Sequence, residues 1–105
     1  MDKRERAYRK TNGRCYYCGE RLNGVFELDH IIPKSAGGYG LDNYAACCSD
    51  CNSMKGVLSV EQFRRYLEEG IFDKFHGRMI KKYYGIRRRH IKFYFEKVGE
   101  KNGKV

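Results

Sequence analysis

The chain of 105 residues is 41% hydrophobic, which suits one domain with too little apolar material for a large core, so an added staple is expected. Its apolar runs are too short to cross a bilayer, and its first ten residues, MDKRERAYRK, are too charged for a secretory signal. We therefore expect a cytoplasmic, intracellular protein without a membrane partner. The formal net charge of +9 favours a nucleic acid as partner; a basic surface that only aids solubility is the alternative.

The first predicted element is a short, highly charged helix from Asp2 to Lys10. Asp2 can cap its N-terminus, and Asn12 and Gly13 follow its last turn and end it. The cysteine knuckle CYYCG comes next. No internal repeat or Pro-rich linker interrupts the chain, so a single domain is predicted over residues 1–105.

A β-hairpin is predicted after the knuckle. GVFELDHIIP, residues 24–33, is rich in β-branched and aromatic side chains and predicts a strand that places Asp29 and His30 near its far end. The glycine-rich KSAGGYG is then a loop, because glycine permits backbone angles that other residues resist. LDNYAAC, residues 41–47, returns as a second short strand.

Two helices are predicted after the hairpin. Ser49 can cap a brief helix, which Gly56 is placed to close in a left-handed turn. Ser59 and Gln62 have the spacing of a capping box at the start of a second helix, which runs through VEQFRRYLEE and ends at Gly70.

The rest of the chain is basic and aromatic. A helix is expected from Asp73 to Tyr84, and the alternation of Ile91, Phe93 and Phe95 predicts a strand. In this interpretation the domain consists of a core over about residues 13–56, a basic extension over 57–98 and a disordered end over 99–105.

Four of the five cysteines have metal-ligand spacing. Cys15 and Cys18 are separated by two residues, as are Cys48 and Cys51. Four thiolates close a tetrahedral zinc site with no position left for water, which makes such a site structural rather than catalytic. The alternative, a redox-active pair, lacks the βαβ context that such a motif needs. Cys47 does not fit the spacing and is expected to be a small buried side chain.

Asp29, His30, Asn43 and Asn52, taken together with the cysteine pairs, resemble the HNH endonuclease family. The matching segments are CYYCG, LDHIIPKSAGG, LDN and CSDCNSMKG, and the resemblance closely covers residues 15–56. It implies an α+β fold, with a small ββα-metal core stapled by a four-cysteine zinc site and flanked by helices. It also implies two ions, one structural Zn²⁺ and one catalytic divalent cation.

The resemblance implies a role for each matching residue. His30 would act as general base on the attacking water, while Asp29 and Asn52 would hold the catalytic metal. Asn43 would be structural, with its amide bonding the backbone near His30 across the hairpin. Some family members have a histidine where this chain has Asn52, and two oxygen donors favour a hard ion, Mg²⁺ or Mn²⁺.

Four cations are candidates for contacts with nucleic-acid phosphates. Lys55 follows Asn52 by three residues on the same helical face, where its ammonium either meets a phosphate oxygen or is a solvated surface charge. Arg87, Arg88 and Arg89 in the basic extension are expected to follow the phosphate backbone, giving affinity without much base readout.

The resemblance, together with the basic charge, implies a metal-dependent endonuclease that nicks double-stranded DNA and leaves 5′-phosphate and 3′-hydroxyl ends. A monomer would nick one strand per site, and a homodimer or two successive events would cut both. So short a nuclease resembles phage-encoded members of the family that work beside packaging proteins. Two alternatives stay open: a non-catalytic zinc module that only binds nucleic acid, and a sequence-specific restriction or homing nuclease.

Overall fold

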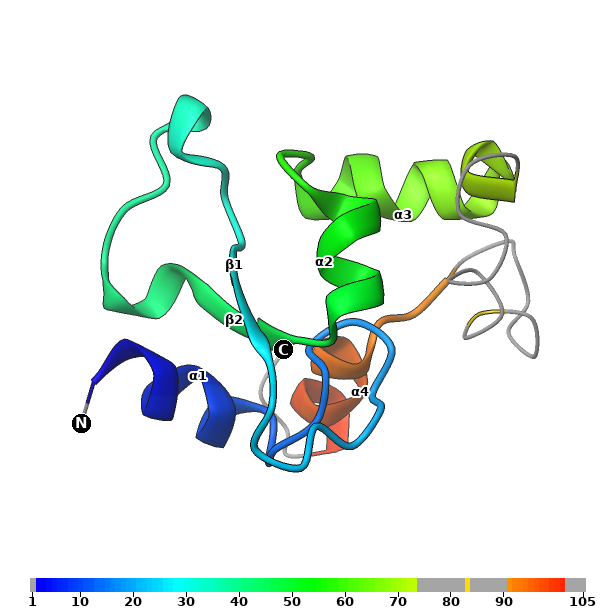
Figure 1. Ribbon diagram of the computed structural model, residues 1–105. Helices are drawn as coiled ribbons and strands as arrows, with labels where there is room; N and C mark the ends of the chain where they lie inside the picture. The colour runs from blue at the N-terminus through cyan, green and yellow to red at the C-terminus, as the bar shows by residue number, and fades with distance from the viewer. Residues whose placement is uncertain (1, 74–82, 84–90, 102–105) are drawn as a thin grey trace.

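The computed structural model describes residues 2–73, 83 and 91–101 of the chain. Its helices and strands follow in the order shown in Figure 1: α1 (Lys3–Lys10), β1 (Glu27–His30), β2 (Tyr44–Cys47), α2 (Ser49–Lys55), α3 (Val60–Glu68) and α4 (Tyr94–Lys101). Within these described residues, short 3-10 turns lie at Lys34–Ala36, Leu41–Asn43 and Ile71–Asp73. The fold is a small α+β arrangement, as the sequence predicts.

β1 and β2 form a two-stranded antiparallel sheet, in which Asp29 pairs with Ala45 and His30 with Tyr44. α2 leaves the end of β2 and packs against β1, so the two strands and the helix make a ββα unit (Figure 1). Both strands are shorter than predicted. β1 covers only Glu27–His30 of the predicted residues 24–33, and Leu41–Asn43 forms a 3-10 turn ahead of β2.

α1 packs against β2, from which it is distant in sequence. The Asp2 side chain accepts the Glu5 N–H at 2.8 Å, which confirms the predicted cap. Ala7 is the buried residue of this helix, and Lys10 Nζ donates to the Tyr44 carbonyl oxygen at 3.0 Å. The charged helix is thereby tied to the start of β2.

Cys48 caps α2, and the prediction of a Ser49 cap is wrong. The backbone is extended at Cys48, where the sulfur accepts the Cys51 N–H at 3.4 Å, and Ser49 is already the first helical residue. At the other end, Gly56 has a positive φ of 49°, but its ψ of -123° lies outside the left-handed helical region, so the predicted left-handed turn is wrong in its detail.

The predicted capping box of α3 is confirmed. Ser59 N–H donates to the Gln62 side chain at 2.9 Å, and Gln62 N–H donates to the Ser59 hydroxyl at 3.1 Å. The helix ends at Glu68, and Gly70, with a φ of 71°, turns the chain away.

The hydrophobic core joins the knuckle, α3 and the segment that precedes α4. The ring of Tyr17 packs edge-on against Phe63 and Phe93, with centroids 5.3 and 5.2 Å away. The rings of Phe63 and Phe93 stack at 5.3 Å, and all three side chains are buried. Aromatic pairs of this kind contribute about 0.5–1.5 kcal/mol each beyond area burial, so they fix the knuckle to α3.

The predicted strand through Ile91, Phe93 and Phe95 is wrong, because a helix begins inside it. The Phe93 N–H donates to the Glu96 carboxylate at 2.9 Å, a contact that favours a helix start. The Phe95 N–H donates to the Tyr16 carbonyl oxygen of the knuckle at 3.0 Å, so it is not available to a strand. Ile91 and Phe93 are nevertheless buried.

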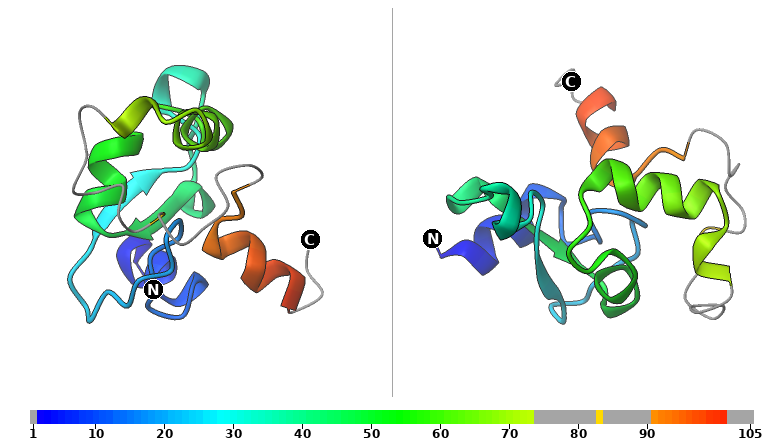
Figure 2. Two further views of the ribbon diagram at one scale, coloured as in Figure 1. Left: turned by 90° about the vertical axis from the view of Figure 1, so that its right-hand side faces the viewer. Right: turned by 90° about the horizontal axis from the view of Figure 1, so that it is seen from above.

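Two further predictions concern the end of the chain. Residues 99–101 were expected to be disordered but belong to α4, which projects away from the sheet in both views of Figure 2. Residues 102–105, and most of the helix predicted from Asp73 to Tyr84, lie outside the described residues.

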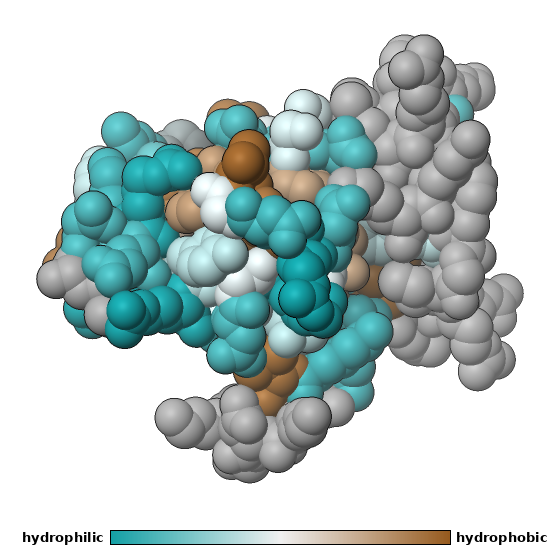
Figure 3. Space-filling model, turned by 60° about the horizontal axis from the view of Figure 1, so that its bottom comes forward, coloured by the Kyte–Doolittle hydropathy of each residue, from teal (hydrophilic) through white to brown (hydrophobic). Residues whose placement is uncertain are grey.

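The surface of the described residues is largely hydrophilic on the face shown in Figure 3, where apolar residues form separate patches. Large exposed apolar side chains come from different segments, among them Val25, Tyr39 and Val57. No helix in the described ranges has both the length and the apolar character needed to span a bilayer.

Candidate active site and cysteine cluster

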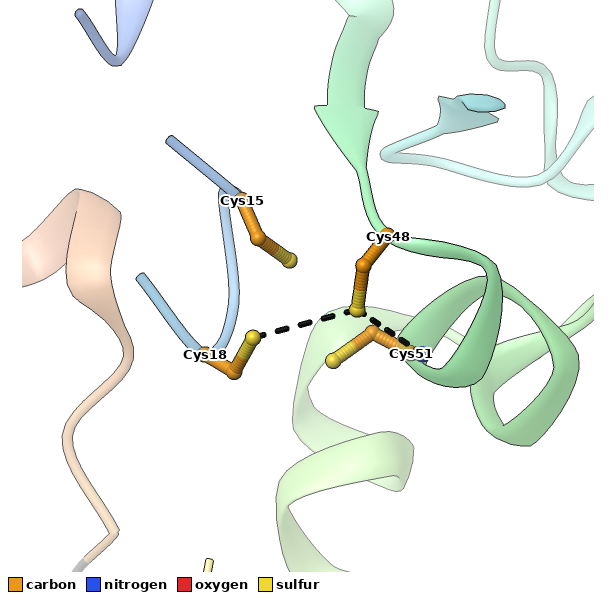
Figure 4. Close-up of side chains that lie close together, drawn as sticks. All are labelled: Cys15, Cys18, Cys48 and Cys51. Carbon is orange, nitrogen blue, oxygen red and sulfur yellow. Dashed lines mark hydrogen bonds between the residues drawn. The ribbon is translucent and has the colours of Figure 1, made fainter. Parts of the chain in front are cut away.

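Four cysteines from two distant segments form one cluster. Cys15 and Cys18 come from the knuckle between α1 and β1, while Cys48 and Cys51 come from the start of α2. Their Sγ atoms all lie within 4.8 Å of one another, and Figure 4 shows the side chains converging. The cluster therefore joins the knuckle to the helix, as the spacing predicts.

The cluster fits the size and chemistry of a tetrahedral zinc site. Zinc–sulfur bonds of about 2.3 Å place neighbouring sulfurs about 3.8 Å apart, and Cys18 Sγ lies 3.8 Å from Cys48 Sγ. Hydrogen bonds among the four thiols lower the pKa of Cys48 and Cys15 and raise the pKa of Cys18 and Cys51, so two of the four thiols are favoured as the thiolates that bind a metal. Four sulfur donors are the ligand set of a structural zinc ion.

Cys47 lies outside this cluster. It is the last residue of β2, pairs with Glu27 across the sheet and has no exposed surface. Burial raises the pKa of its thiol, which disfavours the reactive thiolate. Cys47 is therefore the small buried side chain that its spacing predicts.

Asp29, His30 and Asn52 line one pocket of about 400 Å³ at the end of β1. Neighbouring side chains on a regular strand point to opposite faces. Asp29 and His30 nevertheless both line the pocket, at the end of β1. The rest of the wall comes from β1, the loop after it and the end of α2, through Leu28, Pro33, Lys34, Ser35, Gly56 and Val57.

The Asp29 carboxylate is buried and held by two donors. The Tyr17 hydroxyl donates to Oδ2 at 2.5 Å, and Lys55 Nζ donates to Oδ1 at 3.1 Å and lies 2.9 Å from Oδ2. Burial raises the pKa of Asp29, while the Tyr17 hydrogen bond and the Lys55 ammonium oppose that shift. These contacts use three of about four lone-pair positions, which leaves about one for a ligand.

His30 and Asn52 keep their polar side-chain atoms available. His30 is half-buried, with its ring centroid 5.0 Å from that of Tyr44, and Asn52 is half-buried on α2. Neither side chain makes a hydrogen bond to any residue that the structure describes. As far as the described residues are concerned, an imidazole nitrogen and an amide oxygen are therefore free for water or a ligand in the pocket.

Asn43 ties the two ends of the hairpin loop together beside His30. Its Oδ1 accepts the Ile32 N–H and its Nδ2 donates to the Ile32 carbonyl oxygen, both at 2.9 Å. Gly38 passes so close that a Cβ there would lie 1.8 Å from the Ile32 oxygen and 2.7 Å from Asn43 Nδ2. The loop conformation thus depends on both the amide and the missing side chain.

Neither prediction for Lys55 agrees with the structure. Its side chain is 0% exposed, so it is neither a solvated charge nor open to a phosphate. Nζ bonds the Asp29 carboxylate and donates to the His30 carbonyl oxygen at 2.9 Å, because this face of α2 packs on β1. Arg87, Arg88 and Arg89 lie outside the described residues.

The contact between Tyr17 and Asp29 was missed at the level of sequence. An aromatic residue in a cysteine knuckle is typical of core packing, and no pattern in CYYCG points to a carboxylate. The sequence did contain a signal for the pairing of Lys55 with Asp29. Lys55 shares a helical face with Asn52, and its helix follows a hairpin strand that carries this acid. A buried lysine needs such a partner.

Comparison with known proteins identifies the family. A family model described as HNH endonuclease matches residues 15–68, just over half of the chain. Part of the chain is also 40% identical, over 53 residues, to an uncharacterized protein of Acanthamoeba polyphaga mimivirus. That match covers 47% of this chain and 9% of the viral protein, so the chain spans a small part of this relative. Since the family model covers the cysteine cluster and the whole pocket, the chain belongs to the HNH endonuclease family.

Proposed function

We propose that the chain is a metal-dependent endonuclease that hydrolyses phosphodiester bonds of DNA. One observation carries the proposal: Asp29, His30 and Asn52, which differ in chemistry and come from two separate elements, line the same pocket. Family membership and the net charge of +9 support a polyanionic substrate. Binding alone does not require a carboxylate, an imidazole and an amide at one place.

His30 is the proposed general base. Its imidazole nitrogens carry no hydrogen bond from the described residues, so one of them is able to accept a proton from a water in the pocket. The ring is steadied by Tyr44 on the opposite strand. The water then attacks phosphorus, which would leave a 5′-phosphate and a 3′-hydroxyl end.

Asp29 and Asn52 are the proposed holders of the catalytic cation. The free amide oxygen of Asn52 and the remaining lone pair of Asp29 are hard donors, which fit Mg²⁺ or Mn²⁺ better than a softer metal. A divalent cation bound there would offset the negative charge that develops on the phosphate and the departing 3′ oxygen.

The cysteine cluster and Asn43 have structural roles in this proposal. A Zn²⁺ held by the four thiolates would fix α2, and with it Asn52, relative to the knuckle. The bonds of Asn43 to Ile32 would keep the loop beside His30 in one conformation.

A plasmid-nicking assay tests the proposal. Zinc-loaded protein without other divalent metal is mixed with supercoiled plasmid, and Mg²⁺ or Mn²⁺ is then added while zinc content is followed. Conversion to the open-circular form only after this addition supports the proposal. His30→Ala should abolish nicking but retain DNA binding, whereas His76→Ala, at a histidine outside the family match, should cleave normally.

One result would count against the endonuclease, and a second against the role proposed for His30. DNA binding without strand scission under either metal would favour a module that only binds nucleic acid. Nicking that persists in His30→Ala would remove the imidazole from the reaction. A smear of products indicates little sequence preference, and discrete fragments indicate a sequence-specific nuclease.

A further inference from the structure

The Asp29 carboxylate is connected to both halves of the cysteine cluster. Tyr17 lies inside the knuckle, between Cys15 and Cys18, and donates to Oδ2. Lys55 lies on α2, the helix that Cys48 and Cys51 begin, and bonds both carboxylate oxygens. Each half of the cluster therefore supplies one donor to the same carboxylate.

The Tyr17 hydroxyl has little freedom to leave this contact. The side chain is 1% exposed, and its ring is held edge-on by Phe63 and Phe93. A hydroxyl on so confined a ring fixes the rotation of the carboxylate that accepts from it. The remaining lone pair of the Asp29 carboxylate therefore has a fixed direction before a cation binds.

We propose that Tyr17 is a positioning residue for Asp29, orienting its carboxylate for the divalent cation of the pocket and coupling that site to the cysteine cluster. The inference rests on the proposed function, in which Asp29 holds the cation. Residues that hydrogen-bond a metal ligand commonly change metal affinity or activity about 10- to 100-fold when removed. Tyr17 hydrogen-bonds Asp29, the proposed metal ligand, in this way, and no contact between Tyr17 and the substrate is proposed.

Manganese binding to zinc-loaded protein, followed by the electron paramagnetic resonance of free Mn²⁺ in the absence of DNA, provides the test. Tyr17→Phe removes one hydroxyl and keeps the ring, and we expect Mn²⁺ affinity to fall about tenfold or more. Tyr16→Phe is the matched control, since Tyr16 neighbours it in the knuckle, stacks on Phe95 and has no hydrogen bond to Asp29. The control should stay within about twofold of wild type, and both variants should keep one zinc per chain.

A double-mutant cycle separates positioning from a general loss of structure. If Tyr17 acts through Asp29, then Tyr17→Phe should weaken Mn²⁺ binding no further in an Asp29→Asn background. A further loss in that background would overturn the inference, as would an unchanged Mn²⁺ affinity in Tyr17→Phe alone. Mn²⁺ binding that does not depend on Asp29 would overturn it too.

Kinetics on DNA distinguish this inference from the proposed function. Tyr17→Phe should lower kcat and leave KM for DNA unchanged, because the hydroxyl contacts a side chain of the site and not the substrate. Absence of cleavage by the wild type would refute the endonuclease. The Mn²⁺ measurements would still show whether Tyr17 acts on the cation site through Asp29. Normal cleavage by Tyr17→Phe with normal Mn²⁺ affinity would refute the coupling and leave the endonuclease standing.

Discussion

Lys55 and Asp29 form an ion pair that is almost closed to solvent. Nζ lies 2.9 Å from Oδ2, and the two side chains are 0% and 3% exposed. A third partner, the His30 carbonyl oxygen, accepts from the same ammonium at 2.9 Å. α2 is thus bonded to the two last residues of β1, at the point where the pocket opens.

Removal of this ammonium should be costly for folding. Lys55→Met leaves a buried carboxylate with Tyr17 as its one remaining donor among the described residues, and breaking a buried pair in this way costs about 3–5 kcal/mol. Urea denaturation of zinc-loaded protein measures the change. Lys97→Met, at an exposed position on α4, should stay within about 0.5 kcal/mol of wild type. A loss of less than about 1 kcal/mol for Lys55→Met would argue against a buried ion pair.

Zinc content should separate two adjacent cysteines. Cys48→Ala removes one of four clustered sulfurs and the cap of α2, so bound zinc and much of the helical signal should be lost. Cys47→Ala removes a buried sulfur outside the cluster and should retain one zinc per chain. Elemental analysis and circular dichroism on the two variants make the comparison. Equal zinc loss in both variants would contradict the cluster.

The contribution of the Asn43 amide to the local stability of the loop should be measurable. Asn43→Ala deletes two hydrogen bonds to Ile32, worth about 1 kcal/mol each. Amide hydrogen exchange at Ile32 should accelerate, and the free energy of unfolding should fall by about 2 kcal/mol. Arg9→Ala, which removes an exposed ion pair with Glu5, is the control and should cost little. Unchanged exchange at Ile32 would show that Asn43 does not hold the loop.

Gly38 should tolerate no side chain. In Gly38→Ala the new Cβ would lie 1.8 Å from the Ile32 carbonyl oxygen, which is a clash. This oxygen belongs to the backbone, so it moves only if the backbone moves. The loop must then shift, and we expect nicking to fall at least tenfold along with protection of the Ile32 amide. Gly37→Asn is the control, because a Cβ there meets no described atom within 4 Å and asparagine tolerates a positive φ, here 85°, better than most residues. Similar activity in both variants would mean that the loop conformation does not matter for cleavage.

The parts of the fold that sequence predicts well are those that depend on local chemistry. Asp2 and the Ser59–Gln62 pair bond backbone groups within one turn of themselves, so their roles are legible from spacing alone. The cysteine cluster is predictable for a similar reason, because tetrahedral metal coordination requires short, regular spacings between ligands in the sequence.

The parts that sequence does not predict depend on tertiary contacts. Phe95 lies in a helix because Glu96 and the knuckle carbonyls take the N–H groups that a strand would have used. Lys55 is buried because the Asp29 carboxylate on β1 pairs with it. The sequence of the helix alone does not predict this contact. Asp29, His30 and Asn52 were grouped by family resemblance, while the hydroxyl of Tyr17 against Asp29 has no counterpart in any sequence motif.

The most direct test of a single hydrolytic site is the position of a manganese ion in crystals of the zinc-loaded protein. Anomalous scattering should place one Mn²⁺ within bonding distance of both the Asn52 amide oxygen and an Asp29 carboxylate oxygen, inside the pocket that His30 also lines. A manganese peak bound elsewhere, or no peak between those two oxygens at saturating Mn²⁺, would contradict the account.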